Sequence, residues 1–544
     1  MGEVVNIKDK EIQDQLQFLS PSLWAMDHEL QLQGCKYSLI DHEYQRDITD
    51  SVAESIVVKK AAQLGITESF VIQNLHHQYY GIYPFGVLYL FPSETDVLDF
   101  SRTRFRPLIA RNWFLSEQVK DTDSVNVKNI AGSMLFLRGG RATSRIDGIR
   151  ETSSRLKSIP VDCLYVDERD EISDAMVGLA MERMGHSRVK HYREFSTPSV
   201  PNFGIDVSYT ASTQNIWMIK CAHCGMETCL EKEFPECLGT FLNGNVYRIC
   251  KKCHRPIDPS NGRWVPQFPS RSVQGYYSSQ LMSKLVEPKK ILDAWLHPEK
   301  QIPKTTKTEV MNSKLGLAYI ESENQLTESQ VRNCQCQDPM DYRHEGPCAM
   351  GVDVGAKLHT VIGIKTEGEF KKVLRVAEVD NFNDLHDLAR DYNVQVAVFD
   401  KYPETHKVKE FIKAEKFDGY VCEYSETLTT SEVWNIEESM VKVNRTEILD
   451  QSDKVIRHRK IELPRSSDVM EEFVKHAVSN VKKLERKKST DTPIYRYIQR
   501  GDDHFRHALN YFLLACTRVN EYRRGRYYSD LPRSAGTSAS YLRI

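Results

Sequence analysis

An apolar run that ends in two carboxylates is the most chemically informative part of this sequence. Residues 161–173 read VDCLYVDERDEIS, so Asp167 and then Glu168 follow a short hydrophobic stretch. A buried strand of this kind brings both carboxylates to one edge of a sheet, where one can hold Mg²⁺ and the other can polarise a water. The pattern favours hydrolysis of a nucleoside triphosphate such as ATP, although an ordinary solvated strand end has the same two residues.

A second segment is suited to bind the phosphates. Residues 55–58 form an apolar strand pattern that runs into KKAAQLGIT, residues 59–67, and then into a helical pattern. A glycine-bearing loop with Thr67 at a helix start aims backbone N–H groups and the helix dipole at phosphates. Ile66 stands where the usual pattern has Lys, but the flexible side chain of Lys60 can reach the phosphates from the start of the loop. A plain strand–turn–helix junction remains the alternative.

Three acidic positions in the second half of the chain could bind metal. Asp353 lies within an apolar strand pattern, Asp400 ends another, and the pair Asp502 and Asp503 opens a helical pattern. Carboxylates on separate elements of one α/β core can hold two Mg²⁺ or Mn²⁺ ions about 3.5–4 Å apart for phosphodiester hydrolysis. This arrangement resembles RNase H-like nucleases.

Other interpretations of these residues stay open. An Asp at a helix start is often only a cap. We favour Asp503 over Asp502 as the metal ligand because Asp503 directly precedes a His-x-x-His helix. His504 and His507 either contact the metal ligands without binding the metal or are ordinary surface residues. The Asp-x-Gly at Asp353 also occurs in actin-like ATPases.

Two CxxC pairs indicate a structural metal site. Cys221 and Cys224 form one pair, and Cys250 and Cys253 form the other, after 25 intervening residues. Two such knuckles offer four thiolates to one tetrahedral Zn²⁺, which leaves no open position for catalysis. The remaining cysteines near them, Cys229 and Cys237, are expected to pack. A further trio without a fourth ligand is interpreted as incidental: Cys334, Cys336 and Cys348.

Composition and organisation fit a large α/β protein. The 544 residues carry a net charge of −2, which gives no overall polyelectrolyte character. Neither a signal peptide nor an apolar run of about 18 residues is evident, so we expect a protein of the cytoplasm with no membrane partner. We predict these divisions: an N-terminal segment at 1–40, a parallel-sheet ATPase domain at 41–325 with the zinc-binding insert at about 218–265, a linker at 326–347, an α/β nuclease domain at 348–520 and a basic, partly disordered tail at 521–544.

Four motifs in a fixed order add a family resemblance. KKAAQLGIT, VLYLFPSETD at 87–96, LYVDE at 164–168 and FSTPS at 195–199 follow the order seen in phage DNA-packaging motors. The chain resembles terminase large subunits, especially the branch with a displaced P-loop Lys and a zinc-ribbon-like insert. The likeness runs from SPSLW at 20–24 to DHFRHA at 503–508.

The resemblance implies roles for particular residues. Lys60, Gly65 and Thr67 would bind phosphates and Mg²⁺ together with the loop residues Gln63 and Ile66; Asp167 would help hold Mg²⁺, Glu168 would be the catalytic carboxylate, and Gln45 would read adenine. Ser196, Thr197 and Pro198 resemble the motif that couples hydrolysis to movement. An arginine finger is expected among Arg138, Arg141, Arg145, Arg150 and Arg155, and the sequence does not choose between them.

The same resemblance implies partners. A P-loop NTPase half would drive double-stranded DNA into a procapsid as a homo-oligomeric ring on a portal protein, a small subunit would select the DNA, and an RNase H-like half would cut concatemers in the host cell cytoplasm. Cationic residues 454–465 and 482–500 could contact the DNA backbone or simply face solvent. Two rivals remain: a helicase-like ATPase fused to a repair or transposition nuclease, and a zinc-ribbon DNA-binding scaffold with inactive sites.

Overall fold

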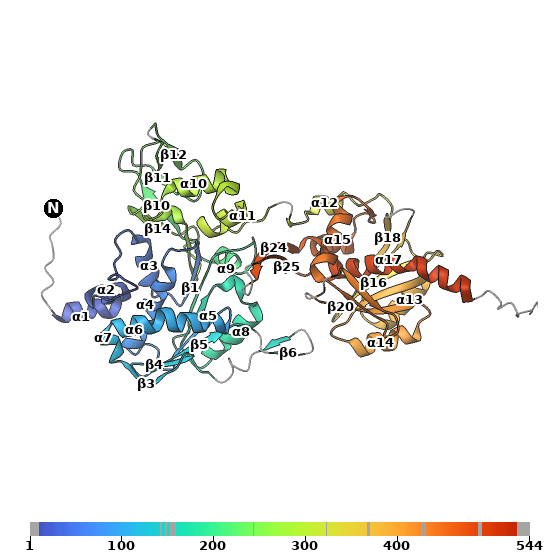
Figure 1. Cartoon of the computed structure of the whole chain (residues 1–544), viewed down its shortest axis with the longest axis horizontal. Helices are drawn as coiled ribbons and strands as arrows, with labels where there is room; N and C mark the ends of the chain where they lie inside the picture. The colour runs from blue at the N-terminus through green and yellow to red at the C-terminus, as the bar shows by residue number, and fades with distance from the viewer. Residues whose placement is uncertain are drawn as a thin grey trace, which may run out of the picture. The chain divides into compact units, whose positions relative to one another are not determined.

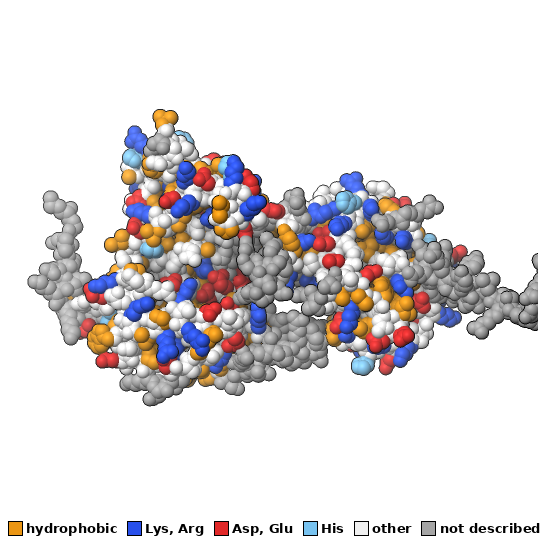
Figure 2. All heavy atoms as spheres, viewed as in Figure 1, with side chains coloured by type: hydrophobic (Ala, Val, Ile, Leu, Met, Phe, Trp, Pro, Cys, Tyr) orange, Lys and Arg blue, Asp and Glu red, His pale blue; other side chains and the backbone are white. Residues whose placement is uncertain are grey.

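The computed structural model describes residues 10–141, 144–146, 150–152, 156, 159–242, 244–321, 324–366, 370–425, 428, 430–487 and 492–529. The chain divides into two compact units (Figure 1), one holding Met1–Ile146 with Arg150–Glu321 and the other holding Ser322–Ile544. We call them unit 1 and unit 2. Charged side chains of both signs are interspersed over the visible face of each unit (Figure 2), in keeping with the net charge of −2.

Unit 1 is built on an eight-stranded sheet in the order β15-β1-β9-β8-β2-β5-β4-β3. Its first six strands in this order, β15 to β5, run parallel to one another. Strand β4 pairs antiparallel with β5 on one side and with β3 on the other. Strands β2 and β8 are buried along their whole length, as expected for inner strands of a parallel sheet that is covered on both faces. Strand bounds are β1 Ser55–Lys60, β2 Val87–Phe91, β3 Val119–Asp123, β4 Val127–Ile130, β5 Ser133–Gly139, β8 Cys163–Asp167, β9 His191–Ser196 and β15 Gln274–Ser278; a separate hairpin joins β6 Ser144–Ile146 and β7 Arg150–Thr152.

Helices and the N-terminal segment complete the core of unit 1. The central helix α4, Ile66–Tyr79, is buried along most of its length. The described residues between 20 and 40 contribute to this core, since Trp24 is fully buried on α2 and α2 packs against α4. The other helices are α1 Lys10–Leu19, α2 Pro21–Asp27, α3 Arg46–Thr49, α5 Glu94–Asp99, α6 Arg106–Arg111, α7 Trp113–Ser116, α8 Asp174–Met181, α9 Ile205–Ala211, α10 Pro288–Leu296 and α11 Lys307–Glu309.

The cysteine-rich insert lies between α9 and β15. It contains the sheet β11-β10-β14 and the hairpin β12-β13, with bounds β10 Ile216–Lys220, β11 Glu227–Thr228, β12 Leu238–Thr240, β13 Val246–Arg248 and β14 Gly262–Val265. Arg248 fixes the hairpin to the rest of unit 1 because its guanidinium donates to the carbonyl oxygens of Leu281 at 2.6 Å and Ser283 at 2.7 Å. Glu231 accepts a hydrogen bond from Ser279 at 2.6 Å, so the insert is anchored at two separate points.

Unit 2 contains a second eight-stranded sheet, in the order β21-β22-β20-β19-β16-β17-β18-β23. Strands β16, β17 and β18 form an antiparallel meander, and β19 and β20 continue the sheet parallel to β16. The strands are β16 Cys348–Val354, β17 Leu358–Lys365, β18 Lys371–Val379, β19 Val394–Asp400, β20 Asp418–Tyr424, β21 Glu432–Asn435, β22 Met440–Val443 and β23 Ile461–Glu462, with a hairpin of β24 Asn480–Lys487 and β25 Thr492–Gln499.

The long helix α17, His504–Ser529, packs across this sheet, chiefly on β16 and β19. Its close approach depends on Gly351, where a Cβ would stand 2.0 Å from the backbone nitrogen of Phe512. The other helices of unit 2 are α12 Glu328–Arg332, α13 Phe382–Asp391, α14 Thr405–Ala414, α15 Arg445–Arg457 and α16 Asp468–Val478.

Two predicted divisions differ from the structure. Residues 326–347 were expected to form a linker, but Leu326 and Val331 are buried in the core of unit 2 and the division falls at Glu321 and Ser322. The nuclease domain was expected to end at 520, whereas α17 continues to Ser529. Residues 530–544, most of the predicted tail, lie outside the described residues. Within the described part of the chain, no helix is both long enough and apolar enough to cross a membrane.

Candidate nucleotide and metal sites

The loop between β1 and α4 has the geometry of a phosphate cradle. Gln63 and Gly65 both have positive φ, 63° and 73°, which turns the chain tightly into the helix. Among the described residues, the backbone N–H groups of residues 63–67 have no hydrogen-bond acceptor. The side chain of Ile66 is buried in the core, so only its N–H group can face a phosphate, whereas Thr67 is partly exposed at the first turn. Free N–H groups at the positive end of a helix bind anions.

Lys60 and Glu168 meet at the carboxyl ends of the parallel strands. The Lys60 Nζ lies 3.0 Å from Glu168 Oε1, and Lys60 itself is buried. Burial alone would lower the Lys60 pKa, but the charges of Glu168 and Asp167 outweigh it and raise that pKa. Burial, followed by the charge of Glu168, raises the pKa of Asp167 to about 7. The raised pKa means that the surroundings of Asp167 do not fully stabilise its negative charge. A Mg²⁺ ion bound there would stabilise it.

The predicted coupling residues lie beside Glu168. Strand β9 separates β1 from β8, so its last residue, Ser196, ends between Lys60 and Asp167. Glu168 Oε2 lies 3.4 Å from both Ser196 Oγ and the Thr197 backbone nitrogen. Asp170 joins this group, because its backbone N–H donates to Ser196 Oγ at 3.3 Å. Glu168 therefore contacts the start of the segment that follows β9.

Gln45 contacts the phosphate loop through its side-chain amide. Its side-chain amide donates to the Leu64 carbonyl at 2.7 Å and its Oε1 accepts from Ser69 at 3.3 Å. A Cβ on Gly65 would stand 2.5 Å from Gln45 Nε2, so the glycine leaves room for this amide. The structure thus brings Gln45 to the loop, and its role toward adenine stays a prediction.

Of the candidate arginine-finger residues, the structure describes the side chains of Arg138 and Arg141. Arg138 donates to the carbonyls of Asn126 and Leu137 at 2.8 and 2.9 Å, Arg141 is exposed, and the side chains of Arg145, Arg150 and Arg155 lie outside the described residues. Sequence reasoning missed Arg104, which pairs with Glu68 at 3.2 Å and helps lower the Asp167 pKa against burial. No motif marks Arg104 in the sequence, because it reaches this region only through folding.

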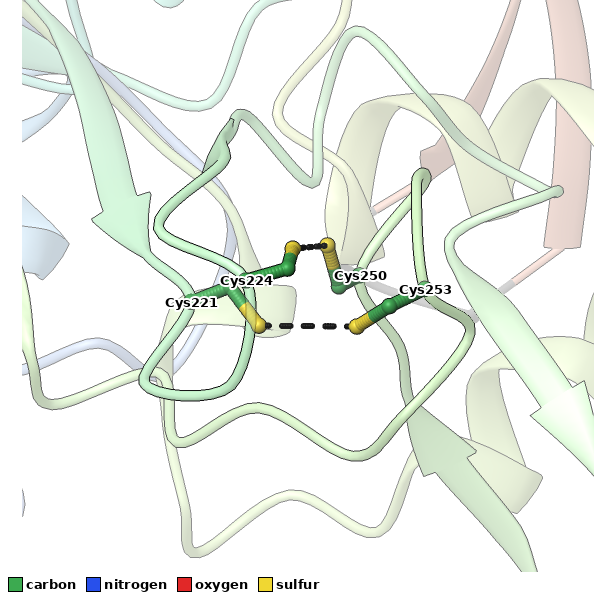
Figure 3. A group of neighbouring side chains, drawn as sticks. All are labelled: Cys221, Cys224, Cys250 and Cys253. Atoms are coloured by element: carbon green, nitrogen blue, oxygen red, sulfur yellow. Dashed lines mark hydrogen bonds between the residues drawn. The ribbon is translucent and has the colours of Figure 1, made fainter.

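Four thiols of the insert converge (Figure 3). Cys221 Sγ lies 3.7 Å from Cys253 Sγ, Cys224 Sγ lies 3.6 Å from Cys250 Sγ, and all four sulfur atoms lie within 4.8 Å of one another. Tetrahedral Zn²⁺ with Zn–S distances of about 2.3 Å places its sulfur ligands about 3.8 Å apart. The donor set and spacing therefore fit Zn²⁺. Cys229 and Cys237 are buried outside this group, as predicted from their spacing.

Asp353 and Asp400 lie side by side in unit 2. Strands β16 and β19 are parallel, and Val352 is in register with Phe399, so the next residues of the two strands are these two carboxylates. Burial, followed by the negative charge of Asp353, raises the pKa of Asp400 to about 7. Two acidic groups in one buried edge repel each other unless a cation neutralises them.

Asp503 is held at the start of α17. It is buried, and its carboxylate accepts hydrogen bonds from Gln499 at 2.8 Å and Asn480 at 3.1 Å, with His507 Nε2 3.0 Å away. Burial opposes its ionisation, but the hydrogen bond with His507 prevails and lowers the Asp503 pKa. Asp502 is exposed. Asp353, Asp400 and Asp503 do not all offer oxygens within 4.8 Å of one another, so three-way ligation needs some adjustment.

The fold and the first site define a class. Unit 1 has the features of a P-loop nucleoside triphosphatase: a phosphate loop, carboxylates at strand ends and a parallel sheet. Residues 40–266 match the sequence model of the phage terminase large subunit gpA, ATPase domain. Unit 1 therefore carries the ATPase domain of the phage terminase large subunits, the ATPases of viral DNA packaging.

Comparison of structures agrees with this fold. The large terminase of bacteriophage HK97 matches at a TM-score of 0.50 with 9% identity, over 91% of this chain and 99% of that one. A large terminase from a thermophilic bacteriophage matches at a TM-score of 0.30 with 11% identity, over 86% and 97%. The ATPase domain of the Thermus phage P74-26 large terminase matches at 0.34 with 11% identity, over 55% and 100%. Comparison with curated proteins gives no match.

Proposed function

We propose that this protein moves double-stranded viral DNA into a procapsid by ATP hydrolysis and cuts concatemeric DNA with a metal-dependent nuclease in unit 2. The observation that carries the motor half is the meeting of Lys60, Glu168 and Ser196 at the ends of three neighbouring parallel strands. Portal protein, small subunit and a homo-oligomeric ring belong to this proposal through the family.

In the motor half, each residue has a separate task. The free N–H groups of residues 63–67 would bind the phosphates, and Asp167 and Thr67 would provide oxygen ligands for Mg²⁺, which would supply positive charge to the phosphates. Lys60 can turn from Glu168 to the phosphates, which releases Glu168 to accept a proton from the attacking water. Ser196 and Thr197 sense that change through their contacts with Glu168.

The nuclease half rests on the strand order and its acidic edge. The order β18-β17-β16-β19-β20, with an antiparallel meander followed by parallel strands, supports an RNase H-like domain. Asp353, Asp400 and Asp503 would hold Mg²⁺ or Mn²⁺, which activates water for phosphodiester hydrolysis. Asp353→Ala should abolish DNA cleavage and spare ATP hydrolysis, whereas Asp387→Ala on the exposed face of α13 should change neither. Retained cleavage by the first variant would refute this centre.

The insert would act as a zinc ribbon with a structural role. Zn²⁺ bound by four thiolates has no open position, so it stabilises the two knuckles without taking part in hydrolysis. Trp264 on β14 donates to the Tyr44 carbonyl at 3.0 Å, directly before Gln45. The zinc ribbon would thus support the short 3-10 helix Glu43–Gln45, from which Gln45 reaches the phosphate loop.

A packaging assay with purified procapsids tests the whole proposal. The wild-type protein with ATP should protect DNA from added nuclease inside procapsids, and Glu168→Gln should not. A helicase-like enzyme would instead unwind duplex DNA without procapsids, and an inactive DNA-binding scaffold would bind DNA without ATP turnover. Either of those results in place of packaging would replace the motor assignment.

A further inference from the structure

The segment between β9 and α9 is attached to residues that lie next to Lys60 and Glu168. Residues 197–204 connect the end of β9 to the start of α9, and we call them the β9–α9 segment. Asp170, two residues after Glu168, binds this segment, and Lys59, the residue before Lys60, binds α9. The segment and the helix that follows it are therefore tied to the ends of the same two strands, β1 and β8, that position the proposed hydrolytic site.

Asp170 receives three hydrogen bonds from this part of the chain. Its Oδ2 accepts from the backbone N–H of Ser199 at 2.7 Å and from the Ser199 hydroxyl at 2.5 Å, and its Oδ1 accepts from the Ile205 N–H at 2.8 Å. Asp170 is only 8% exposed, so breaking these charge-assisted bonds would leave buried polar groups without partners. Its carboxylate therefore fixes the β9–α9 segment at two points, Ser199 and Ile205.

Gly204 allows the chain to approach this carboxylate. Its backbone angles, φ 52° and ψ −124°, are readily adopted by glycine and not by residues with a Cβ. A Cβ at this position would stand 2.3 Å from Asp170 Oδ1 and 2.8 Å from Asp170 Cγ. A substitution at Gly204 thus disturbs the Asp170 carboxylate without removing it.

The second attachment comes from Lys59, which points to the opposite face of the sheet from Lys60 because successive strand residues alternate. Lys59 Nζ lies 3.1 Å from Asp206 Oδ1 and 4.4 Å from the centre of the Tyr209 ring, both on α9. Asp206 Oδ2 in turn accepts from the Asn202 backbone N–H at 2.9 Å. The first turn of α9 and the β9–α9 segment are therefore held together on β1.

The carbonyl oxygen of Ser199 extends these contacts toward the end of unit 1. It accepts hydrogen bonds from Asn312 Nδ2 at 2.8 Å and from the Tyr319 N–H at 3.3 Å. Both residues belong to the stretch 310–319, which we call the exit segment because Tyr319 lies two residues before the end of unit 1. The exit segment also contacts the phosphate loop, since the Ala62 N–H donates to the Ser313 carbonyl at 2.8 Å. Ser199 thus joins Asp170 on one side to the exit segment on the other.

We propose that Asp170 is a positioning residue that passes the nucleotide state of unit 1 through Ser199 to the exit segment. ATP and ADP differ in the γ-phosphate alone, so a difference at the exit segment must start from groups that face it. Asp170 follows Glu168 closely, and its backbone N–H contacts Ser196 Oγ at 3.3 Å. A shift of this strand end carries Ser199 with it, because the alternative is to break buried hydrogen bonds. The inference rests on the proposed hydrolytic role of Glu168 and needs neither DNA nor the nuclease.

Hydrogen exchange of the full-length protein tests this connection without DNA. Amide exchange of residues 199–206 and 310–319 is measured with a non-hydrolysable ATP analogue and with ADP, each with Mg²⁺. In wild type, protection of both segments should differ between the two nucleotides. Asp170→Asn replaces an accepting oxygen by an NH₂ group that faces donors, so the difference at 310–319 should be lost. The KM for ATP should stay that of wild type, which a general loss of structure would not allow.

Three further variants complete the design. Ser199→Ala removes one donor and keeps the backbone, so it should fold normally and reduce the nucleotide-dependent difference at 310–319, even where Asp170→Asn fails to fold. Gly204→Ala should reproduce the loss seen in Asp170→Asn, because it disturbs the same carboxylate. Asp99→Asn makes the same chemical change at an exposed position and should behave as wild type.

The outcomes separate this connection from the motor itself. A nucleotide-dependent difference at 310–319 that persists unchanged in Asp170→Asn and Ser199→Ala would overturn the proposal. Equal loss in Asp99→Asn would overturn it as well, because the effect would not be specific to Asp170. Wild-type protein that hydrolyses ATP but shows no difference at 310–319 would refute this connection alone, whereas wild-type protein that binds ATP without hydrolysing it would refute the proposed motor.

Discussion

Lys60 and Glu168 form an ion pair across the ends of strands that are not neighbours, with Nζ 3.0 Å from Oε1. Strand β9 lies between β1 and β8, so the pair spans the residue that ends β9, Ser196. Under the proposed mechanism Lys60 would turn from Glu168 to the phosphates of a bound nucleotide, so this ion pair would hold Glu168 until ATP binds.

Replacing the carboxylate at this pair should separate binding from turnover. Glu168→Gln keeps the shape of the side chain but removes the base, so ATP hydrolysis should fall by roughly 10²–10⁴-fold while nucleotide binding remains. Steady-state phosphate release and a nucleotide-binding titration measure the two effects. Glu182→Gln, the same change at an exposed position, should alter neither. Unchanged turnover in Glu168→Gln would remove Glu168 from the reaction.

A methyl group at the phosphate loop should disturb Gln45. Gly65→Ala would suffer the strain of a left-handed residue, about 1–2 kcal/mol, and would also drive a Cβ to 2.5 Å from Gln45 Nε2. Gly81→Ala has a similar φ, 68°, and nothing within 4 Å, so it isolates the backbone strain. Both variants should lower the melting temperature of unit 1, but only Gly65→Ala should weaken ATP binding. Equal ATP affinity in the two would show that Gln45 does not support the loop.

Loss of one thiolate should release the zinc of the ribbon. Cys250→Ser leaves three ligands, and because metal binding contributes directly to folding of such knuckles, the insert should become protease-sensitive. Metal analysis should find one zinc per chain fewer than in wild type. Cys35→Ser, at an exposed cysteine away from the insert, is the control and should leave zinc content and proteolysis unchanged. An unaltered zinc content in Cys250→Ser would return these cysteines to ordinary packing.

Acid should destabilise unit 1 through a buried histidine. His76 is fully enclosed, its Nε2 lies 2.8 Å from the Gln17 carbonyl oxygen, and burial lowers its pKa to about 4. Between about pH 6.5 and pH 4 the unfolded chain binds a proton here and the folded chain does not, so stability falls as the pH is lowered through that window. The largest effect is about 3 kcal/mol.

Thermal melts of unit 1 from pH 7 to pH 4.5 check this histidine. His76→Gln should show a shallower decline than wild type, and His186→Gln, at an exposed histidine, should follow the wild-type curve. Parallel declines for all three proteins would assign the acid sensitivity to other groups.

The sequence predicted the residues that end strands and missed those that meet through register. Asp167 and Asp400 were predicted because each closes an apolar run, and the structure places each at the end of a parallel strand. The position of His359 opposite Asp353 was not predicted, because it follows from antiparallel pairing, which a single sequence does not display. Residues 326–347 were misassigned as a linker because their polar, turn-rich composition hides the buried Leu326.

The path of α17 over β16 gives the last test, because it carries Asp503 and His504 to the acidic edge. At Gly351 a Cβ would meet the backbone of α17 at Phe512 N, 2.0 Å, and Ala508 O, 2.2 Å, and backbone atoms cannot move aside as side chains do. Gly351→Ala should therefore displace α17, lowering the free energy of unfolding of unit 2 by about 1–3 kcal/mol or more.

Gly355→Ala is the matched control for Gly351→Ala, since its Cβ would meet nothing closer than the Lys357 carbonyl oxygen at 3.5 Å. Chemical denaturation followed by the signal of unit 2, together with Mg²⁺-dependent DNA cleavage, measures both consequences. Because Gly351→Ala removes no carboxylate, reduced cleavage in that variant would come from the position of α17 alone. Equal stability and cleavage in the two variants would mean that the helix tolerates a larger separation from β16, and that the acidic edge does not depend on its close approach.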